Sequence, residues 1–198
     1  MNLSIKNLEK RFDDKVIFSG LSCDFNSYGI YVISGDSGVG KTTLLRIIAG
    51  IDKNYDGEIL GGGFERVSVC FQEYRLFDGL SALKNITEVA FKKADECNVT
   101  RAKEMLKKLR FTDGEINLKP KELSGGMKQR VAFVRAVMKE TPILILDEPT
   151  KEVDSEISEI MKEIIAEEAK DRLVLLVTHK NEDLTGLKYN EIKLGTRS

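Results

Sequence analysis

The stretch that decides the fold is G-D-S-G-V-G-K-T, Gly35–Thr42. It follows the apolar run Ile30–Ser34 and precedes T-L-L-R-I-I-A, Thr43–Ala49, which has the composition of a helix. Strand, glycine loop and helix thus frame the full G-x-x-x-x-G-K-[ST] pattern. A chance glycine-rich turn would lack this combination, so the stretch predicts a phosphate-binding loop in an α/β fold.

Each residue type in this loop suits the binding of a polyphosphate. Gly35, Gly38 and Gly40 let the backbone turn tightly and bring N–H groups onto phosphate oxygens. The helix that follows presents its positive end to the same anion. Lys41 supplies a positive charge for the β and γ phosphates, and the Thr42 hydroxyl is a Mg²⁺ ligand. The other residues of the predicted loop are Asp36, Ser37, Val39 and Thr43.

A pair of acids follows a second apolar run, in I-L-I-L-D-E-P, Ile143–Pro149. A buried strand that ends in two acids places them at the carboxyl edge of the sheet, where ligands bind in open α/β folds. Asp147 is predicted to hold Mg²⁺ through water, and Glu148 to polarise a water aimed at the γ-phosphate. Acids often simply end a strand, but beside a phosphate-binding loop the functional interpretation is favoured.

The single histidine, His179, comes just after a third apolar run, Leu173–Val177. Its position after this run predicts that His179 lies at the same sheet edge as the phosphate-binding loop. There it is a candidate to contact the γ-phosphate or to orient the attacking water. A lone histidine is otherwise usually structural or exposed.

The rest of the chain alternates strand-like and helix-like segments, which predicts mostly parallel strands. Between about Leu76 and Lys121 the apolar spacing is helical and no clear strand appears, so this part is expected to be a helical insertion. Further strands are expected at Leu21–Phe25, Val67–Phe71 and Tyr189–Leu194, and further helices at Gly126–Lys139 and Ser155–Ala169.

A second candidate phosphate-binding element is L-S-G-G-M-K-Q-R, Leu123–Arg130. Ser124, Gly125 and Gly126 precede a helix and form an N-terminus suited to an anion. A serine N-cap on an ordinary helix would explain Ser124 but not the two glycines. One chain therefore carries two predicted phosphate-binding helix ends.

This last motif, together with its spacing before Asp147, resembles the signature of ATP-binding-cassette ATPases. The resemblance covers about Met1 to Leu194. It implies that Phe12 stacks on adenine, that Gln72 reaches Mg²⁺ and links the core to the helical subdomain, and that Asp154 belongs to a loop crossing a dimer interface. It also implies that His179 is a catalytic switch histidine beside the catalytic Glu148 and Gln72.

The resemblance implies one domain, residues 1–198, with a P-loop NTPase core and an N-terminal antiparallel β portion. Residues 1–75 and 122–198 would form the α/β core, and about 76–121 a helical subdomain that ends at the signature motif. The implied cofactors are ATP and Mg²⁺.

The implied function is the hydrolysis of ATP to ADP and phosphate at a head-to-tail dimer interface, which powers a membrane transporter. Phe71–Ile86 and the signature are similar to importers of the nitrate, sulfonate and taurine type. The implied partners are a second copy, transmembrane permease subunits and, as a further candidate, an extracytoplasmic substrate-binding protein. The expected location is cytoplasmic, peripheral on the inner face of the cell membrane.

Two other functions remain alternatives: a mechanical ATPase of the DNA-repair type and a cassette serving a cell-division complex. The interval between the two phosphate-binding motifs carries neither the long coiled coil nor the zinc module of the repair type. A kinase or GTPase would leave Leu123–Arg130 unexplained. Lys151 and Glu152 depart from the family's usual serine and alanine, so crosstalk between the two sites is expected to be altered.

Composition agrees with a globular ATPase and excludes other classes. The 198 residues carry a net charge of −1, whereas a large nucleic-acid footprint would need a basic excess, so no nucleic acid is expected. The three cysteines are far apart, which favours reduced thiols over disulfides or zinc. The longest apolar runs, such as Leu173–Val177, are too short to span a membrane.

Overall fold

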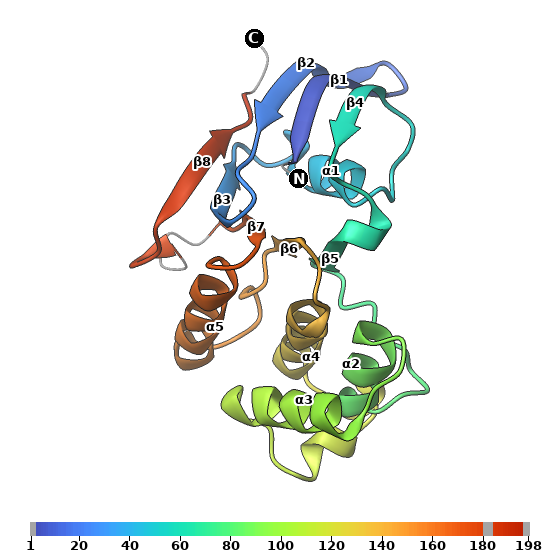
Figure 1. Cartoon of the computed structure of the whole chain (residues 1–198), viewed down its shortest axis with the longest axis vertical. Helices are drawn as coiled ribbons and strands as arrows, with labels where there is room; N and C mark the ends of the chain where they lie inside the picture. Colours follow the sequence, from blue (N-terminus) through green and yellow to red (C-terminus); the bar gives the residue numbers. More distant parts are fainter. Residues whose placement is uncertain (1–2, 180–183, 196–198) are drawn as a thin grey trace.

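The structure, a computed structural model, describes residues 3–179 and 184–195. A five-stranded sheet crosses the middle of the molecule, with a small antiparallel sheet and α1 (Lys41–Ile48) at one end (Figure 1). Most of the other helices gather at the opposite end. The α/β class and the mostly parallel sheet predicted from the sequence are confirmed.

The five-stranded sheet is parallel throughout. In spatial order its strands are β5 (Val67–Cys70), β6 (Ile143–Asp147), β7 (Leu173–Val177), β3 (Gly29–Ser34) and β8 (Tyr189–Lys193). All residues of β6 and β7 are buried, as their continuous apolar runs predict. The carboxyl ends of β3, β6 and β7 therefore meet at one edge of the sheet.

Side chains from the two faces of this sheet enter two different cores. Leu144 and Leu146 of β6 pack into the core on the side of α4 (Gly125–Met138) and α5 (Ser155–Glu168). Ile143 and Ile145 of the same strand pack into the core that contains α1 and the antiparallel sheet. Successive side chains of β6 thus point to opposite faces, so the sheet is packed between two layers, each with its own core.

The antiparallel sheet has the order β2–β1–β4, formed by β2 (Lys15–Asp24), β1 (Ser4–Phe12) and β4 (Asp56–Leu60). It confirms the expected N-terminal antiparallel portion, but the sequence revealed only the end of β2 and missed β1 and β4. Charged residues alternate with apolar ones in β1, and β4 has a single partly buried residue. Neither strand presents the continuous apolar run that marks the parallel strands.

The segment between β5 and α4 is helical, as expected. Its α-helices are α2 (Ala82–Ala90) and α3 (Glu96–Lys108), and its short 3₁₀ turns are Glu115–Asn117 and Pro120–Glu122; a further such turn, Phe64–Arg66, precedes β5. Buried Ile86 and Leu106 join the core of α4. Ser81 and Asp95 cap α2 and α3 by accepting hydrogen bonds from backbone N–H groups.

In the part of the chain that the structure describes, no helix combines the length and apolar character that crossing a lipid bilayer requires.

Candidate functional site

The loop between β3 and α1 adopts a conformation that depends on glycine. Gly40 has φ +109°, and a Cβ there would lie 2.5 Å from Cγ2 of Ile17. Both the left-handed backbone and the close approach of β2 exclude other residues. Gly40 is also the N-cap of α1, so the loop leads directly into the positive end of that helix.

Lys41, the first residue of α1, points back into the loop. Its side chain is nearly buried, and Nζ donates hydrogen bonds to the carbonyl oxygens of Gly35 at 2.7 Å and Asp36 at 3.0 Å. The ammonium is therefore held at the mouth of the loop by groups that phosphate oxygens can replace.

Asp147 and Thr42 form the part of the site suited to a metal ion. The Thr42 hydroxyl donates to Oδ2 of Asp147 at 2.8 Å, and Oδ1 of Asp147 is buried without a hydrogen-bond partner. Burial raises the pKa of Asp147, while the hydrogen bond from Thr42 opposes this rise. An unpaired carboxylate oxygen beside a hydroxyl fits Mg²⁺, which takes few protein ligands and completes its shell with phosphates and water.

Glu148 follows Asp147 in a strained backbone conformation, with φ +51°. Its N–H donates to the carbonyl of Val177 at 2.8 Å, which joins the acid to the end of β7. Oε1 lies 3.2 Å from Nε2 of His179, and Oε2 lies 3.6 Å from Nζ of Lys151. The carboxylate is thus fixed between an imidazole and an ammonium, in a position to receive a proton from a water molecule.

These groups surround one cavity of about 230 Å³. Among the predicted site residues, those that line it are Ser37, Gly38, Gly40, Lys41, Thr42, Thr43, Gln72, Asp147, Glu148 and His179. Val39 lines a neighbouring cavity of about 300 Å³, and both cavities share Ile17, Ser37 and Gly38. The phosphate-binding loop, Gln72, the acid pair and the histidine therefore converge on a single cavity, with a second cavity beside it.

Phe12 is not among the residues that line either cavity. It lies at the end of β1, half exposed, with the ammonium of Lys10 4.6 Å from the centre of its ring. Its predicted contact with adenine stays a prediction.

The second phosphate-binding element does not share this cavity. Ser124 caps α4, its hydroxyl accepting a hydrogen bond from the N–H of Met127 at 3.2 Å. Asp154 caps α5 in the same way, by accepting from the N–H of Ile157 at 2.9 Å. Neither of these residues, nor Gly125 or Gly126, lines the cavity at Lys41. One chain therefore holds the predicted residues in two separate groups.

The sequence did not predict two contacts of the loop after β6. Lys151 lies beside the carboxylate of Glu148, and Glu152 lies against Gly125 and Gly126. In the sequence, both residues depart from the family's usual serine and alanine, and this departure was the only sign that their contacts would be unusual. The partners were not predictable, because they are brought close only by the folded loop.

With this geometry established, the comparisons with known proteins define the class. The sequence model of the family described as ABC transporter matches residues 18–151. The spermidine/putrescine import ATP-binding protein PotA of Thermotoga maritima is 37% identical over 166 residues, which cover 78% of this chain. The aliphatic sulfonates import ATP-binding protein SsuB of Bacillus cereus is 34% identical over 193 residues, 90% of this chain. The chain belongs to the ABC transporter family.

The matched regions differ in how much of each relative they span. They cover 45% of the Thermotoga maritima protein, less than half its length, and 75% of the Bacillus cereus protein. A solved dimeric structure of the ATP-binding cassette MJ0796, in a post-hydrolysis state bound to ADP and Pi, has a TM-score of 0.83 and 26% identity. The structural match covers 98% of this chain and 97% of the MJ0796 chain, so the whole described fold is that of an ATP-binding cassette.

Proposed function

We propose that this chain binds Mg-ATP and hydrolyses it to ADP and phosphate between two copies of itself, and that this drives an importer. The observation that carries the proposal is the convergence of Lys41, Thr42, Asp147, Glu148 and His179 on one cavity. These residues supply a countercharge for phosphates, a metal site and a proton acceptor. Together they are the parts that phosphoryl transfer to water requires.

In this mechanism Lys41 exchanges its two carbonyl contacts for β- and γ-phosphate oxygens. Thr42, Asp147 and Gln72 would hold Mg²⁺, which neutralises charge on the same phosphates when bound. Glu148 accepts a proton from the attacking water through one carboxylate oxygen. His179 holds Oε1 of Glu148, at 3.2 Å, so that the carboxylate keeps its orientation.

The second half of the site would come from another copy. The N-terminus of α4, at Ser124 to Gly126, lies outside the cavity, and in the proposed dimer it would receive the γ-phosphate of a nucleotide bound to the partner. Two copies related by a two-fold axis then share two nucleotides across an isologous interface. The cassette MJ0796, whose fold is similar to that of this chain, is itself a dimer bound to ADP and Pi, which supports such pairing.

A mixing experiment tests the shared site. Lys41→Ala disables the phosphate-binding loop, and Ser124→Arg places a bulky cation at the signature, so each variant alone should hydrolyse ATP at a small fraction of the wild-type rate. A mixed dimer contains one intact site, made from the loop of the Ser124→Arg copy and the signature of the Lys41→Ala copy. Phosphate release measured across mixing ratios should therefore recover, with its maximum near equal amounts.

If no ratio restores hydrolysis, the site is not shared. If Ser124→Arg alone keeps the wild-type rate, the signature takes no part in it.

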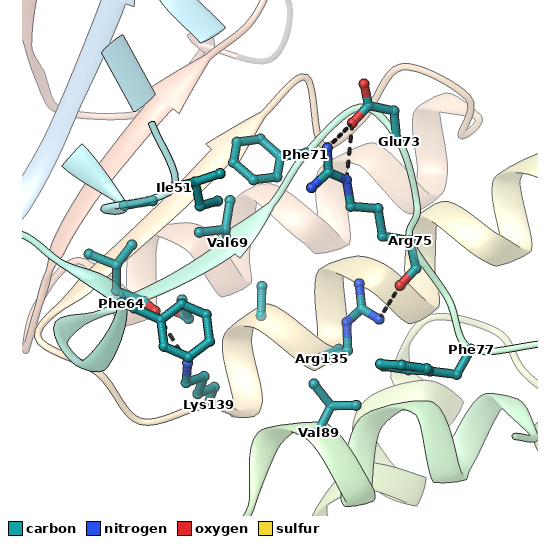
Figure 2. A pocket seen from close by; sticks show the side chains of 14 residues that line it. Ile51, Phe64, Val69, Phe71, Glu73, Arg75, Phe77, Val89, Arg135 and Lys139 are labelled. Atoms are coloured by element: carbon teal, nitrogen blue, oxygen red, sulfur yellow. Dashed lines mark hydrogen bonds and ion pairs between the residues drawn. The ribbon is translucent and has the colours of Figure 1, made fainter. Parts of the chain in front are cut away.

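A groove at the junction of core and helical segment is the proposed docking place for a transmembrane permease subunit. It has a volume of about 250 Å³, and Figure 2 shows the side chains that surround it. Four large apolar side chains in its lining are exposed: Ile51, Phe64, Phe77 and Val89. An exposed apolar hollow of this kind marks an interaction site.

The wall of this groove is fixed and positively charged. Arg135 of α4 donates to the carbonyl oxygen of Arg75 at 2.8 Å, as Figure 2 shows, and to that of Tyr74, also at 2.8 Å. Arg75 itself pairs with Glu73 at 2.9 Å, and the ammonium of Lys139 lies 4.8 Å from the ring centre of Phe64. A permease segment that fits here would insert apolar side chains and carry an acidic residue near Lys139.

Cysteine crosslinking in native membranes tests this docking. Cys97 is exposed and is first replaced by serine, and a single cysteine is then introduced at Arg75 or Asp78. Both positions should crosslink to an integral membrane protein, because Arg75 lines the groove and Asp78 directly follows Phe77, which also lines it. A cysteine at Glu58, on the exposed β4, is the matched control and should not.

Absence of any membrane crosslink from Arg75 or Asp78 would contradict a transporter role. A crosslink to a division protein instead would favour a non-transport complex. The importer assignment is supported by the similarity to two import ATP-binding proteins, and in such an importer the chain would lie on the cytoplasmic face of the membrane. An extracytoplasmic substrate-binding protein would complete such an importer.

A further inference from the structure

The carboxylate of Glu152 lies against the N-terminal end of α4. A Cβ at Gly125 would be 2.2 Å from Oε2 of Glu152, and a Cβ at Gly126 would be 2.6 Å from the Glu152 carbonyl oxygen. The backbone of the loop after β6 can approach this closely only because position 126 is glycine, and the absence of a side chain at Gly125 leaves room for the Glu152 carboxylate. An anionic side chain therefore sits at the positive end of a 14-residue helix.

Tyr74 fixes the carboxylate in this place. Its hydroxyl forms a hydrogen bond with Glu152 and lies 3.4 Å from the same Cβ position at Gly125. Burial, with the hydrogen bond and negative charge of Glu152 added, raises the pKa of Tyr74 to about 12. The tyrosine is therefore protonated at neutral pH and donates its hydrogen bond to the carboxylate.

We propose that Glu152 is a charge gate on the pairing of two copies: its carboxylate, held by Tyr74 against Gly125, opposes the arrival of the partner's γ-phosphate at Ser124 to Gly126. The inference rests on the shared site proposed above. The Glu152 carboxylate and the γ-phosphate are both negative and would repel each other beside the same helix end. The carboxylate also already neutralises part of the positive potential of the α4 N-terminus that would attract the phosphate. ATP must therefore either displace the Glu152 side chain or bind more weakly because of the repulsion from its carboxylate.

Arg135 connects Tyr74, which holds the Glu152 carboxylate, to the wall of the groove described above. Arg135 bonds the backbone carbonyl of Tyr74 and also that of Arg75, which lines the groove. A segment that enters the groove would therefore contact a wall that is hydrogen-bonded to the backbone of Tyr74, the residue that holds the Glu152 carboxylate.

The test measures ATP-dependent pairing of Glu148→Gln chains by sedimentation, with Glu152→Gln added. Glutamine keeps the shape and removes the charge. Pairing should tighten about fivefold for each shared site, the factor that corresponds to roughly 1 kcal/mol of repulsion between two charges at about 4 Å in water. Since a dimer contains two such sites, its dissociation constant should fall about 25-fold.

Two further measurements separate a charge gate from a structural role. The difference between Glu152 and its glutamine variant should shrink as salt rises to about 1 M, because salt screens charges. Tyr74→Phe, which keeps the ring and removes the hydroxyl, should also tighten pairing, by releasing the carboxylate. Glu163→Gln, the same charge change on an exposed residue of α5, is the control and should leave pairing unchanged.

Pairing that is unchanged or weakened in Glu152→Gln, while Glu148→Gln alone pairs with ATP, would overturn the gate and leave the shared site standing. If Glu148→Gln itself remains a monomer with ATP at every protein concentration, the shared site fails and the gate fails with it.

Discussion

Replacing Lys41 with alanine is expected to abolish ATP binding in a protein that still folds. The ammonium is nearly buried, and its two partners are backbone carbonyls of its own loop, at 2.7 and 3.0 Å. Removing the countercharge of a buried polyanion costs about 2–5 kcal/mol. Affinity for a fluorescent ATP analogue should therefore fall by roughly 30-fold to more than 1,000-fold.

The control for this variant is Lys53→Ala, which removes an exposed lysine away from the cavity and should bind the analogue as the wild type does. Circular dichroism and thermal unfolding establish that both variants are folded. A folded Lys41→Ala protein with near-wild-type affinity would show that phosphates do not bind at this loop.

The fold was predictable where a strand is buried on both faces. Ile143–Asp147 is apolar up to its final aspartate, and Leu173–Val177 is apolar throughout. Such runs are characteristic of parallel strands. Ser4–Phe12 was missed because one face is solvated and register shifts interrupt its pairing with both neighbours. Its strand character depends on partners that come from distant parts of the chain.

The site was predictable where its chemistry lies within one motif or at one sheet edge. Lys41 and Thr42 are adjacent in sequence, and Asp147 reaches Thr42 because β3 and β6 both end at that edge. The contacts of Lys151 and Glu152 were not predictable, because they depend on the path of a short loop after β6. Phe12 remains a prediction from resemblance: its position matches a family motif, and in the structure its ring lies beside the ammonium of Lys10.

Replacing Glu148 with glutamine is expected to separate binding from chemistry. The amide retains the shape of the side chain and an oxygen that accepts hydrogen bonds, so Lys41, Thr42 and Asp147 still bind Mg-ATP. An amide does not accept a proton from water, and loss of a general base slows a reaction by about 10²–10⁴-fold. Phosphate release by the variant should fall by this factor while affinity for ATP is maintained.

Slow hydrolysis should trap the pair of copies that ATP holds together. In the proposed shared site, the nucleotide's negative charge would lie between the positive end of α1 in one copy and that of α4 in the other, so pairing should last as long as the γ-phosphate is present. On gel filtration the Glu148→Gln protein should run as a dimer with ATP and as a monomer without it, and adding Ser124→Arg should leave it monomeric. Hydrolysis at the wild-type rate would show that Glu148 is not the base. A variant that binds ATP yet stays monomeric at high protein concentration would instead contradict the shared site, because the unhydrolysed γ-phosphate would then hold nothing together.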